Sequence, residues 1–198
     1  MDTMKPFAES CEQNKHVIFD AIKFEFSEHK DILEIGSGTG QHAVFFAAQL
    51  PHLSWQPSEQ DENISGITEW LKDYPHDNIP HPISLDVTKK WPKKTFDGVF
   101  SANTAHIMGW EEVKYLFKGV GNTLNPNGTF CLYGPFNHNQ QFTSESNARF
   151  DQWLKQQNPV RGIRDFEDLN NLARENNLIF KKEIEMPHNN KILIWKKE

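Results

Sequence analysis

The chain of 198 residues carries a formal net charge of −6, with 37 % hydrophobic and 12 % aromatic residues. These values exclude an intrinsically disordered chain and are sufficient for one domain with a substantial core. The acidic balance argues against a protein that binds a nucleic-acid duplex, because such proteins present a basic face. The two cysteines, Cys11 and Cys131, lie far apart, so we expect neither a disulfide framework nor a cysteine metal site.

The sequence shows no signal for targeting, membrane insertion or metal binding. The run MDTMKPFAESCEQNK lacks the apolar core of a signal peptide. No apolar run reaches the roughly 18 residues that cross a membrane. The nine histidines are dispersed, without an HxxxH or HxH pair. We therefore expect a cytoplasmic protein that binds neither metal nor membrane.

Hydrophobic periodicity predicts helices alternating with strands. Residues 8–27 have apolar positions at helical spacing, so residues 1–28 are expected to be a helical lead-in to a single domain of residues 1–198. Strands are predicted at DILEIG, LSWQ, residues 83–87, FDGVFSAN and TFCLYGPF. Helices are predicted between them at GQHAVFFAAQL, residues 61–74 and GWEEVKYLFKGVGNTL, and NPNG predicts a turn.

The last third of the chain completes the expected sheet. Residues 144–176 contain two helical segments, divided near Asn158-Pro159, and LIFKKEIEM and KILIW are joined by PHNN as in a hairpin. This order predicts an α/β fold with a mostly parallel seven-stranded sheet, helices on both faces and a C-terminal antiparallel hairpin. Sheets of this kind bind ligands at the carboxyl ends of their strands.

A glycine-rich loop follows the first predicted strand, in LEIGSGTGQHAVFFA. Gly36, Gly38 and Gly40 lie between a strand and a helix, where a nucleotide can bind. A dinucleotide fingerprint would need Gly or Ala where Gln41 stands. The pattern E-x-G-x-G-x-G, from Glu34 through Ser37 to Gly40, is instead similar to motif I of class I methyltransferases that use S-adenosylmethionine (SAM). This resemblance implies that Glu34 orients the loop or meets the methionine ammonium; a purely structural glycine turn is the alternative.

Residues at the ends of two further predicted strands are suited to bind an adenosine. Glu59 follows the glycines by about 20 residues, where nucleotide-binding folds place a carboxylate for the ribose hydroxyls. Asp61 is the competing candidate, and it could instead cap the next helix. In the methyltransferase class, an acidic or polar residue after the third strand accepts from the adenine amine, and the next residue packs on the ring or donates its backbone N–H. Asp86 and Val87 in SLDVT fit these two roles, although Asp86 could be an ordinary strand-end residue.

The fourth strand ends in SANTAHI, which places Asn103 and His106 where such folds hold the transferred methyl and the substrate. His106 could be a general base, since a histidine ordinarily titrates near pH 6.5, or it could be structural. We assign Asn103 to both cofactor binding and catalysis. The absence of an NPPY or DPPY tetrad disfavours methylation of planar amino groups.

A polar segment, YGPFNHNQQFTSESNARFD, follows the fifth strand, where such folds form a substrate lid. Its candidates for a small polar pocket are Tyr133, Asn137, Ser144, Ser146 and Asn147. The alternative is a solvated loop in which Ser144 or Ser146 caps the following helix.

Nearly the whole chain resembles a small family of methyltransferase-like proteins of about this length, a domain of unknown function found in bacteria and animals. The resemblance is carried by FAESCEQNKHVI, LEIGSGTGQHAVFFA, WQPSE and LYGPFNHNQQFTSESNARFD. It implies a Rossmann-like class I methyltransferase fold with SAM as cofactor. The family pattern WQPSD has Asp where this chain has Glu59, which lengthens the arm of the carboxylate. The resemblance also suggests that Asn14, as a substrate-binding residue, and Lys15 fold over the cofactor cleft.

The sequence therefore predicts a SAM-dependent methyltransferase acting on a small-molecule acceptor. A hydroxyl acceptor would need His106 or a lid residue to take its proton, whereas an amine or thiolate would need no base. A non-catalytic module that binds SAM or its demethylated product, S-adenosylhomocysteine (SAH), is the alternative. A nicotinamide-dependent oxidoreductase is disfavoured by Gln41.

Overall fold

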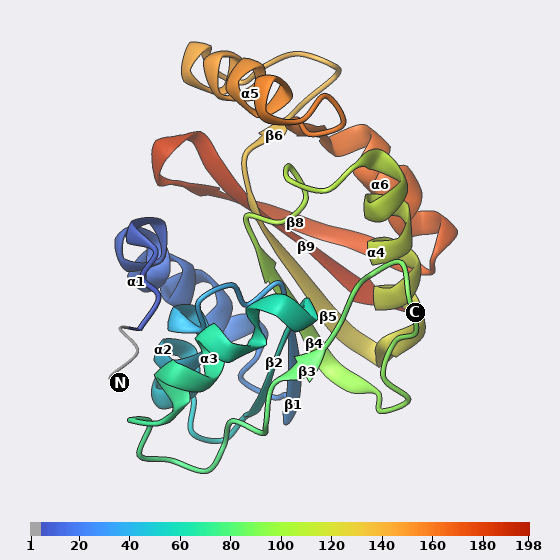
Figure 1. Ribbon diagram of the computed structural model, residues 1–198. Coiled ribbons are helices and arrows are strands. Elements are labelled where there is room, and N and C mark those ends of the chain that lie inside the picture. The colour runs from blue at the N-terminus through green and yellow to red at the C-terminus, as the bar shows by residue number, and fades with distance from the viewer. Residues whose placement is uncertain (1–4) are drawn as a thin grey trace.

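A seven-stranded sheet forms the centre of the computed structural model, which describes residues 5–198 (Figure 1). The strands in spatial order are β3 (Ile83–Ser84), β2 (Ser54–Glu59), β1 (Asp31–Ile35), β4 (Phe96–Ala102), β5 (Leu124–Gly134), β9 (Asn190–Lys197) and β8 (Leu178–Met186). The first five are parallel to one another, and β9 runs antiparallel to both β5 and β8. The predicted mostly parallel sheet with a C-terminal antiparallel hairpin is confirmed.

Helices cover both faces of the sheet, as predicted. Helices α1 (Glu9–Glu25) and α2 (Gln41–Gln49) pack on one face, and α4 (Trp110–Thr123) and α6 (Phe166–Glu175) pack on the other. Because alternate strand residues point to opposite faces, Ile32 of β1 joins the first layer and Leu33 the second. Within residues 5–198, no helix is both long enough and apolar enough to cross a bilayer.

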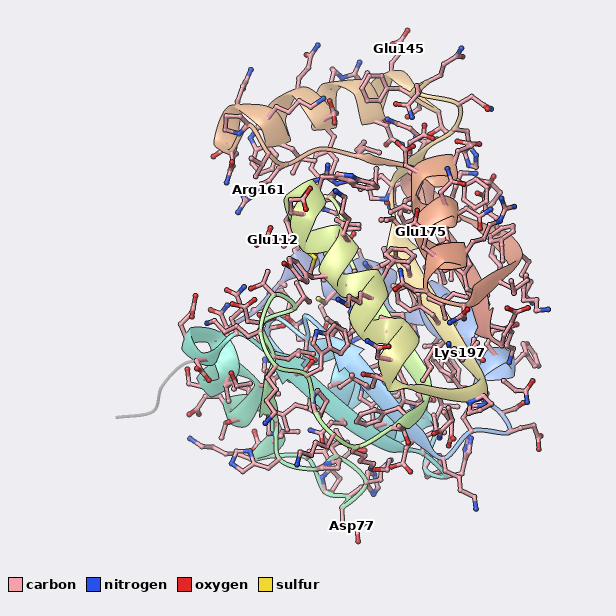
Figure 2. The ribbon with its side chains drawn as sticks, turned by 90° about the vertical axis from the view of Figure 1, so that its right-hand side faces the viewer. Asp77, Glu112, Glu145, Arg161, Glu175 and Lys197 are labelled. Atoms are coloured by element: carbon pink, nitrogen blue, oxygen red, sulfur yellow. The ribbon has the colours of Figure 1, made fainter. Side chains whose placement is uncertain are left out.

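Two helices lie at the edges of this layered core. Helix α3 (Ile64–Leu71) follows the 3-10 turn η1 (Asp61–Asn63) after β2. Helix α5 (Glu145–Gln157) stands at the end of the molecule to which β5 leads. Figure 2 shows this from the α4 side, with Glu145 of α5 labelled at one end of the molecule and Asp77 at the other. The carboxyl ends of the parallel strands and α5 therefore lie at the same end of the molecule.

The structure corrects four local predictions. The NPNG segment, predicted as a turn, lies within β5, where the pairing with β4 shifts in register. The strand expected over residues 83–87 is only Ile83–Ser84, because Asp86 turns the chain by accepting the Thr88 amide on its side chain. The predicted helix over residues 61–74 is divided into η1 and α3. A second, two-stranded parallel sheet of β6 (Phe136–Asn137) and β7 (Arg164–Asp165) was not predicted. Residues 1–4 of the expected lead-in lie outside the described residues.

Glu34 fixes the end of β1 against β2, directly below the glycine loop. Its carboxylate accepts from Trp55 Nε1 at 2.9 Å, and its carbonyl accepts from Ser58 Oγ at 2.6 Å. Ser37 in the loop donates its amide to the Ser58 carbonyl at 2.9 Å. Burial raises the pKa of Glu34 to about 7. The hydrogen bonds from Trp55 and Ser37 lower this pKa, and the nearby Glu59 carboxylate raises it.

This burial predicts a pH-dependent contribution to stability. The folded-state pKa of Glu34 lies above the 4.5 of an unperturbed glutamate, so folding favours the protonated form and stability is lost as the pH rises from 4.5 to 7. Glu34→Gln removes this titration. The free energy of unfolding of Glu34→Gln, relative to the native chain, should rise by about 1–3 kcal/mol between pH 5 and pH 8. Urea unfolding at both pH values measures the difference, and a pH-independent difference would contradict the assignment.

Candidate functional site

The glycine loop presents an open backbone surface at the end of β1. Gly36, Gly38 and Gly40 have φ values of 71°, 55° and 91°, in the left-handed region that disfavours side chains. A Cβ at Gly36 would lie 2.5 Å from Thr104 Cγ2, whereas a Cβ at Gly38 would meet nothing within 4 Å. Gly36 thus allows close contact with the end of β4, and Gly38 leaves space for a ligand beside the N-terminus of α2.

Glu59, at the end of β2, reaches back to this loop. Its Oε2 accepts the Gly38 amide and its Oε1 accepts the Gln60 amide, both at 2.8 Å. The longer arm of glutamate therefore bridges the strand end and the loop. Each carboxylate oxygen has two acceptor positions, so Glu59 retains capacity for a ligand hydroxyl. Asp61, the competing candidate, begins the η1 turn.

Asp86 and Val87 lie after β3 in different environments. Asp86 Oδ1 accepts the amide and the hydroxyl of Thr88 at 3.0 and 2.7 Å, and these bonds hold its pKa below the ordinary range. Its Oδ2 lies 3.2 Å from the ammonium of Lys89. Val87 is buried in the core on the α4 side. The carboxylate edge thus faces solvent, while the Val87 side chain belongs to the core.

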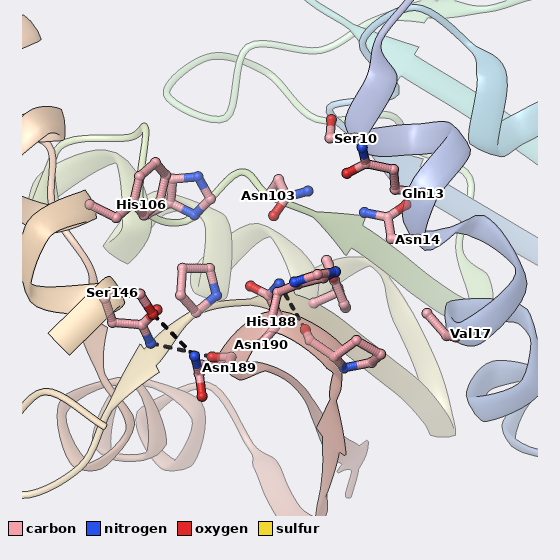
Figure 3. A pocket seen from close by; sticks show the side chains of 15 residues that line it. Ser10, Gln13, Asn14, Val17, Asn103, His106, Ser146, His188, Asn189 and Asn190 are labelled. Carbon is pink, nitrogen blue, oxygen red and sulfur yellow. Dashed lines mark hydrogen bonds between the residues drawn. The ribbon is translucent and has the colours of Figure 1, made fainter. Parts of the chain in front are cut away.

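The chain bends sharply where β4 ends, at Asn103. Its φ of 58° is unusual for a residue other than glycine, and its amide donates to the Tyr133 carbonyl at 2.9 Å. Thr104 and Ser101 share a hydrogen bond of 2.7 Å, and the Ser101 hydroxyl donates to the Ile35 carbonyl at 2.8 Å. This network joins the end of β4 to the glycine loop and directs the Asn103 side chain toward a cavity (Figure 3).

The cavity has a volume of about 540 Å³ and gathers residues from distant parts of the chain. It contains six of the residues proposed from sequence: Asn14, Asn103, His106, Tyr133, Ser146 and Asn147. Asn137 does not line it, and the buried Oδ1 of Asn137 has no hydrogen-bond partner among the described residues. Ser144 caps α5 by accepting the amide of Asn147 at 3.1 Å. In the segment predicted to form a lid, Ser144 therefore caps α5, whereas Ser146 lines the cavity.

His106 is buried at the cavity wall and uncharged near neutral pH. Burial lowers its pKa to about 4, and the nearby guanidinium groups of Arg164 and Arg161 lower it further. Its ring packs edge-on against Phe150 of α5, with centroids 5.3 Å apart. The His106 carbonyl accepts the Gly162 amide at 3.0 Å. The imidazole is therefore held in its neutral form, which is the form that can accept a proton.

The first two residues of α2 bind helix α1 across the loop. Gln41 Oε1 accepts the Ala8 amide at 2.6 Å, and its Nε2 donates to Glu12 at 2.8 Å. His42 Nε2 lies 2.7 Å from Asn14 Oδ1. These contacts hold α1 at the rim of the cavity, where it contributes Asn14. Lys15, also suggested to cover the cleft, pairs with Glu12 within α1.

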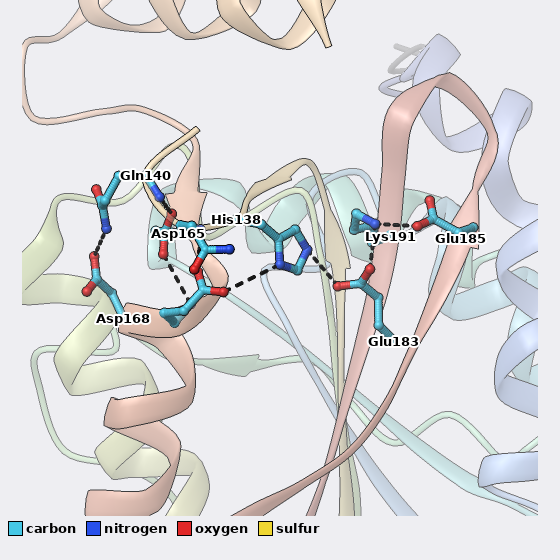
Figure 4. A network of polar contacts seen from close by, with 9 residues as sticks. His138, Gln140, Asp165, Asp168, Glu183, Glu185 and Lys191 are labelled. Carbon is cyan, nitrogen blue, oxygen red and sulfur yellow. Dashed lines mark hydrogen bonds and ion pairs between the residues drawn. The ribbon is translucent and has the colours of Figure 1, made fainter. Parts of the chain in front are cut away.

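A polar network anchors the segment that contains α5 (Figure 4). His138, just after β6, lies 2.9 Å from Glu183 of β8 and 3.7 Å from Glu167 of α6. The buried ammonium of Lys191 pairs with Glu183 at 2.5 Å and also with Glu185. Together with the β6–β7 pairing, these contacts fix both ends of the segment between β6 and β7, which contains α5 and brings it to the cavity.

Sequence reasoning missed the wall formed by residues 187–190. His188 and Asn189 have positive φ in the 3-10 turn η2 (Pro187–Asn189), and both line the cavity with Asn190. The sequence PHNN signalled only a hairpin connection. Gln13 and Phe150 are further lining residues that no motif indicated. Within residues 5–198, no group of three or more His, Cys, Asp or Glu side chains is arranged to hold a metal ion.

Comparison with solved structures places this arrangement in a known fold. An O-methyltransferase family protein from Burkholderia thailandensis matches with a TM-score of 0.81 and 11 % identity, covering 96 % of this chain and 58 % of that chain. Human N-acetylserotonin methyltransferase in complex with SAM matches with a TM-score of 0.76 and 15 % identity, covering 96 % and 53 %. PigF with SAH matches with a TM-score of 0.80 and 14 % identity, covering 95 % and 56 %.

This chain spans a little over half the length of these three structures, and at these identities the likeness establishes the fold alone. The fold is that of the Rossmann-like, SAM-dependent methyltransferases. The expected family is found as well, because the family model described as "Protein of unknown function (DUF938)" matches residues 5–197. The chain therefore belongs to that family.

Proposed function

We propose that the protein is a SAM-dependent methyltransferase that transfers a methyl group to a small-molecule acceptor with a hydroxyl group. The observation that carries this proposal is the position of Asn103 between the two parts of the site. Gly36 of the loop packs on Thr104, and the adjacent Asn103 lines the cavity. A methyl group on a cofactor held at the loop would thus face an acceptor in the cavity.

The residues around the loop fit SAM by their chemistry. The open face of Gly38 admits a ligand backbone, and the Glu59 carboxylate beside it suits a ribose diol. Asp86 would accept from the adenine amine, next to Val87. Glu34 and Ser37 would act by fixing the loop rather than by contact, because both are almost fully buried. The similarity to a methyltransferase in complex with SAM, and to another structure with SAH, supports this assignment.

The protein's own groups would orient the acceptor and manage its proton. SAM supplies a methyl group on a sulfonium, and its departing thioether needs no proton. His106 is neutral and would accept the proton of an acceptor hydroxyl, whose acidity rises as its oxygen bonds to carbon. Asn103 would orient the acceptor from the end of β4. The buried setting of His106 excludes competing water, and alignment of the reactants supplies the remaining rate enhancement.

Cofactor binding provides the first test. Glu59→Ala removes the carboxylate that faces the loop and the expected ribose position, so the SAM affinity measured by calorimetry should fall about 10- to 100-fold. Glu59→Gln keeps one acceptor oxygen, so its affinity for SAM should fall less than that of Glu59→Ala. Glu111→Ala on the exposed start of α4 is the matched control and should bind SAM as the native chain does. Undiminished binding by Glu59→Ala would remove Glu59 from the cofactor site, and no binding by the folded native chain would refute the function.

His106→Ala tests catalysis separately from binding. Transfer of labelled methyl from SAM to the small molecules of a cell extract should fall about 100-fold or more, with SAM affinity unchanged. The low pKa of His106 also predicts that activity of the native chain persists from pH 8 to pH 5.5, because the ring gains its proton only near pH 4. Full activity in His106→Ala would exclude a base role. Binding of SAM by the native chain without any transfer would instead indicate a regulatory module.

A further inference from the structure

The cavity beside the glycine loop is lined by no carboxylate, ammonium or guanidinium group. Its fifteen lining residues include no Asp, Glu, Lys or Arg, although such residues make up 24 % of the chain. Six of the fifteen are carboxamides, contributed by α1, the end of β4, α5 and the β8–β9 connection. Carboxamides both donate and accept hydrogen bonds, but they do not neutralise an ion. A charged molecule entering this cavity would lose water without gaining a counter-charge.

Asn14 has a fixed orientation among these carboxamides. Its Oδ1 accepts from His42 Nε2 at 2.7 Å, and burial keeps His42 neutral by lowering its pKa to about 4. The His42 ring is held in plane by stacking on Phe46, with centroids 5.1 Å apart. Because the oxygen of Asn14 is committed to His42, its amide nitrogen faces the cavity (Figure 3).

Tyr133 continues this chain of hydrogen bonds. Burial raises the pKa of its hydroxyl, and hydrogen bonds with the side chains of Asn14 and Asn190 oppose the shift. Asn14 and Asn190 thus lie beside the Tyr133 hydroxyl at the cavity wall. Asn14, oriented by His42, and Tyr133 thus present uncharged polar groups to the cavity.

Asn147 supplies the complementary acceptor. Its Nδ2 donates to Thr143 Oγ1 at 3.0 Å and to the Asn189 carbonyl at 3.2 Å. Both hydrogens of the Asn147 side-chain amide are thus bonded within the protein, which leaves its Oδ1 as an acceptor for a ligand.

We propose that the methyl acceptor is an uncharged molecule with hydrogen-bonding groups, and that Asn14, positioned by His42, is the residue that selects it. The proposal rests on the methyltransferase function above. In place of Asn14, an aspartate would put a carboxylate beside the acceptor. It could no longer donate a hydrogen bond to a carbonyl or hydroxyl oxygen, and it would favour a cation.

The test uses labelled SAM and a protein-free cell extract separated by ion exchange into neutral, anionic and cationic fractions. The native chain should label a product in the neutral fraction at least about 10-fold more strongly than in either charged fraction. Stronger labelling in a charged fraction would overturn the proposal. Absence of label in every fraction, with SAM bound, would refute methyl transfer itself, on which the proposal depends.

Variants then test the assigned residue. Asn14→Asp should reduce labelling in the neutral fraction about 10-fold and increase it in the cationic fraction, with SAM bound by calorimetry and an unchanged melting temperature. Asn171→Asp makes the same change on the exposed surface of α6 and should leave the pattern unchanged. An unchanged fraction preference in folded Asn14→Asp would show that Asn14 does not select the acceptor.

His42 is tested as a positioning residue. His42→Phe keeps a ring to stack on Phe46 but cannot donate to Asn14, so KM for the labelled neutral acceptor should rise about 10-fold while kcat changes little. His42→Gln restores a donor and should recover KM. Equal KM values for the native chain and His42→Phe would contradict the role of His42. A parallel loss of kcat and SAM binding would indicate a structural effect and would also contradict it.

Discussion

The site depends on the attachment of helix α1 to the first turn of α2. Below the cavity, Ile18 and Ile22 bury α1 against the sheet by ordinary hydrophobic packing. At the level of the cavity, the attachment is polar and comes from Gln41 and His42, consecutive residues directly after the glycine loop. Hydrophobic burial has no direction, whereas these hydrogen bonds fix the rotation and height of α1. The position of Asn14 in the cavity wall follows from them.

Charge is separated across the two halves of the site. On the cofactor side, the carboxylates of Glu59 and Asp86 lie at strand ends with partial exposure to water. On the cavity side, desolvation shifts the buried His42 and His106 toward their uncharged forms by lowering their pKa values, and below the glycine loop it raises the pKa of Glu34. The same cause, desolvation, acts in opposite directions on acids and bases. A cationic cofactor and an uncharged acceptor are the pair that suits this separation.

The sequence was informative where a property is local. Strand and helix positions follow from hydrophobic periodicity, and the glycine loop, Glu59 and Asn103 follow from their places at strand ends in a parallel sheet. The short β3 was mispredicted because an Asp86 turn competes with pairing at the sheet edge. The β6–β7 pair joins residues 136–137 with residues 164–165, and such pairing leaves no periodic signal. The roles of Gln41 and His42 were also hidden, because their partners lie about 30 residues earlier in α1.

The cavity takes most of its lining from segments outside the sheet, and Tyr133 of β5 and Asn190 of β9 are the sheet residues among the lining. Its walls come from α1, α5 and the β8–β9 connection, and each has its own attachment: Gln41 and His42 for α1, the β6–β7 pair for α5, and the Lys191 ion pairs beside residues 187–190. The glycine loop and Glu59, in contrast, are fixed by β1 and β2 within the sheet. Under the proposed function, changes in the wall segments can therefore alter the acceptor without disturbing the strands that would hold the cofactor. Function in such a fold is determined by these added walls, which is why the fold alone does not name the acceptor.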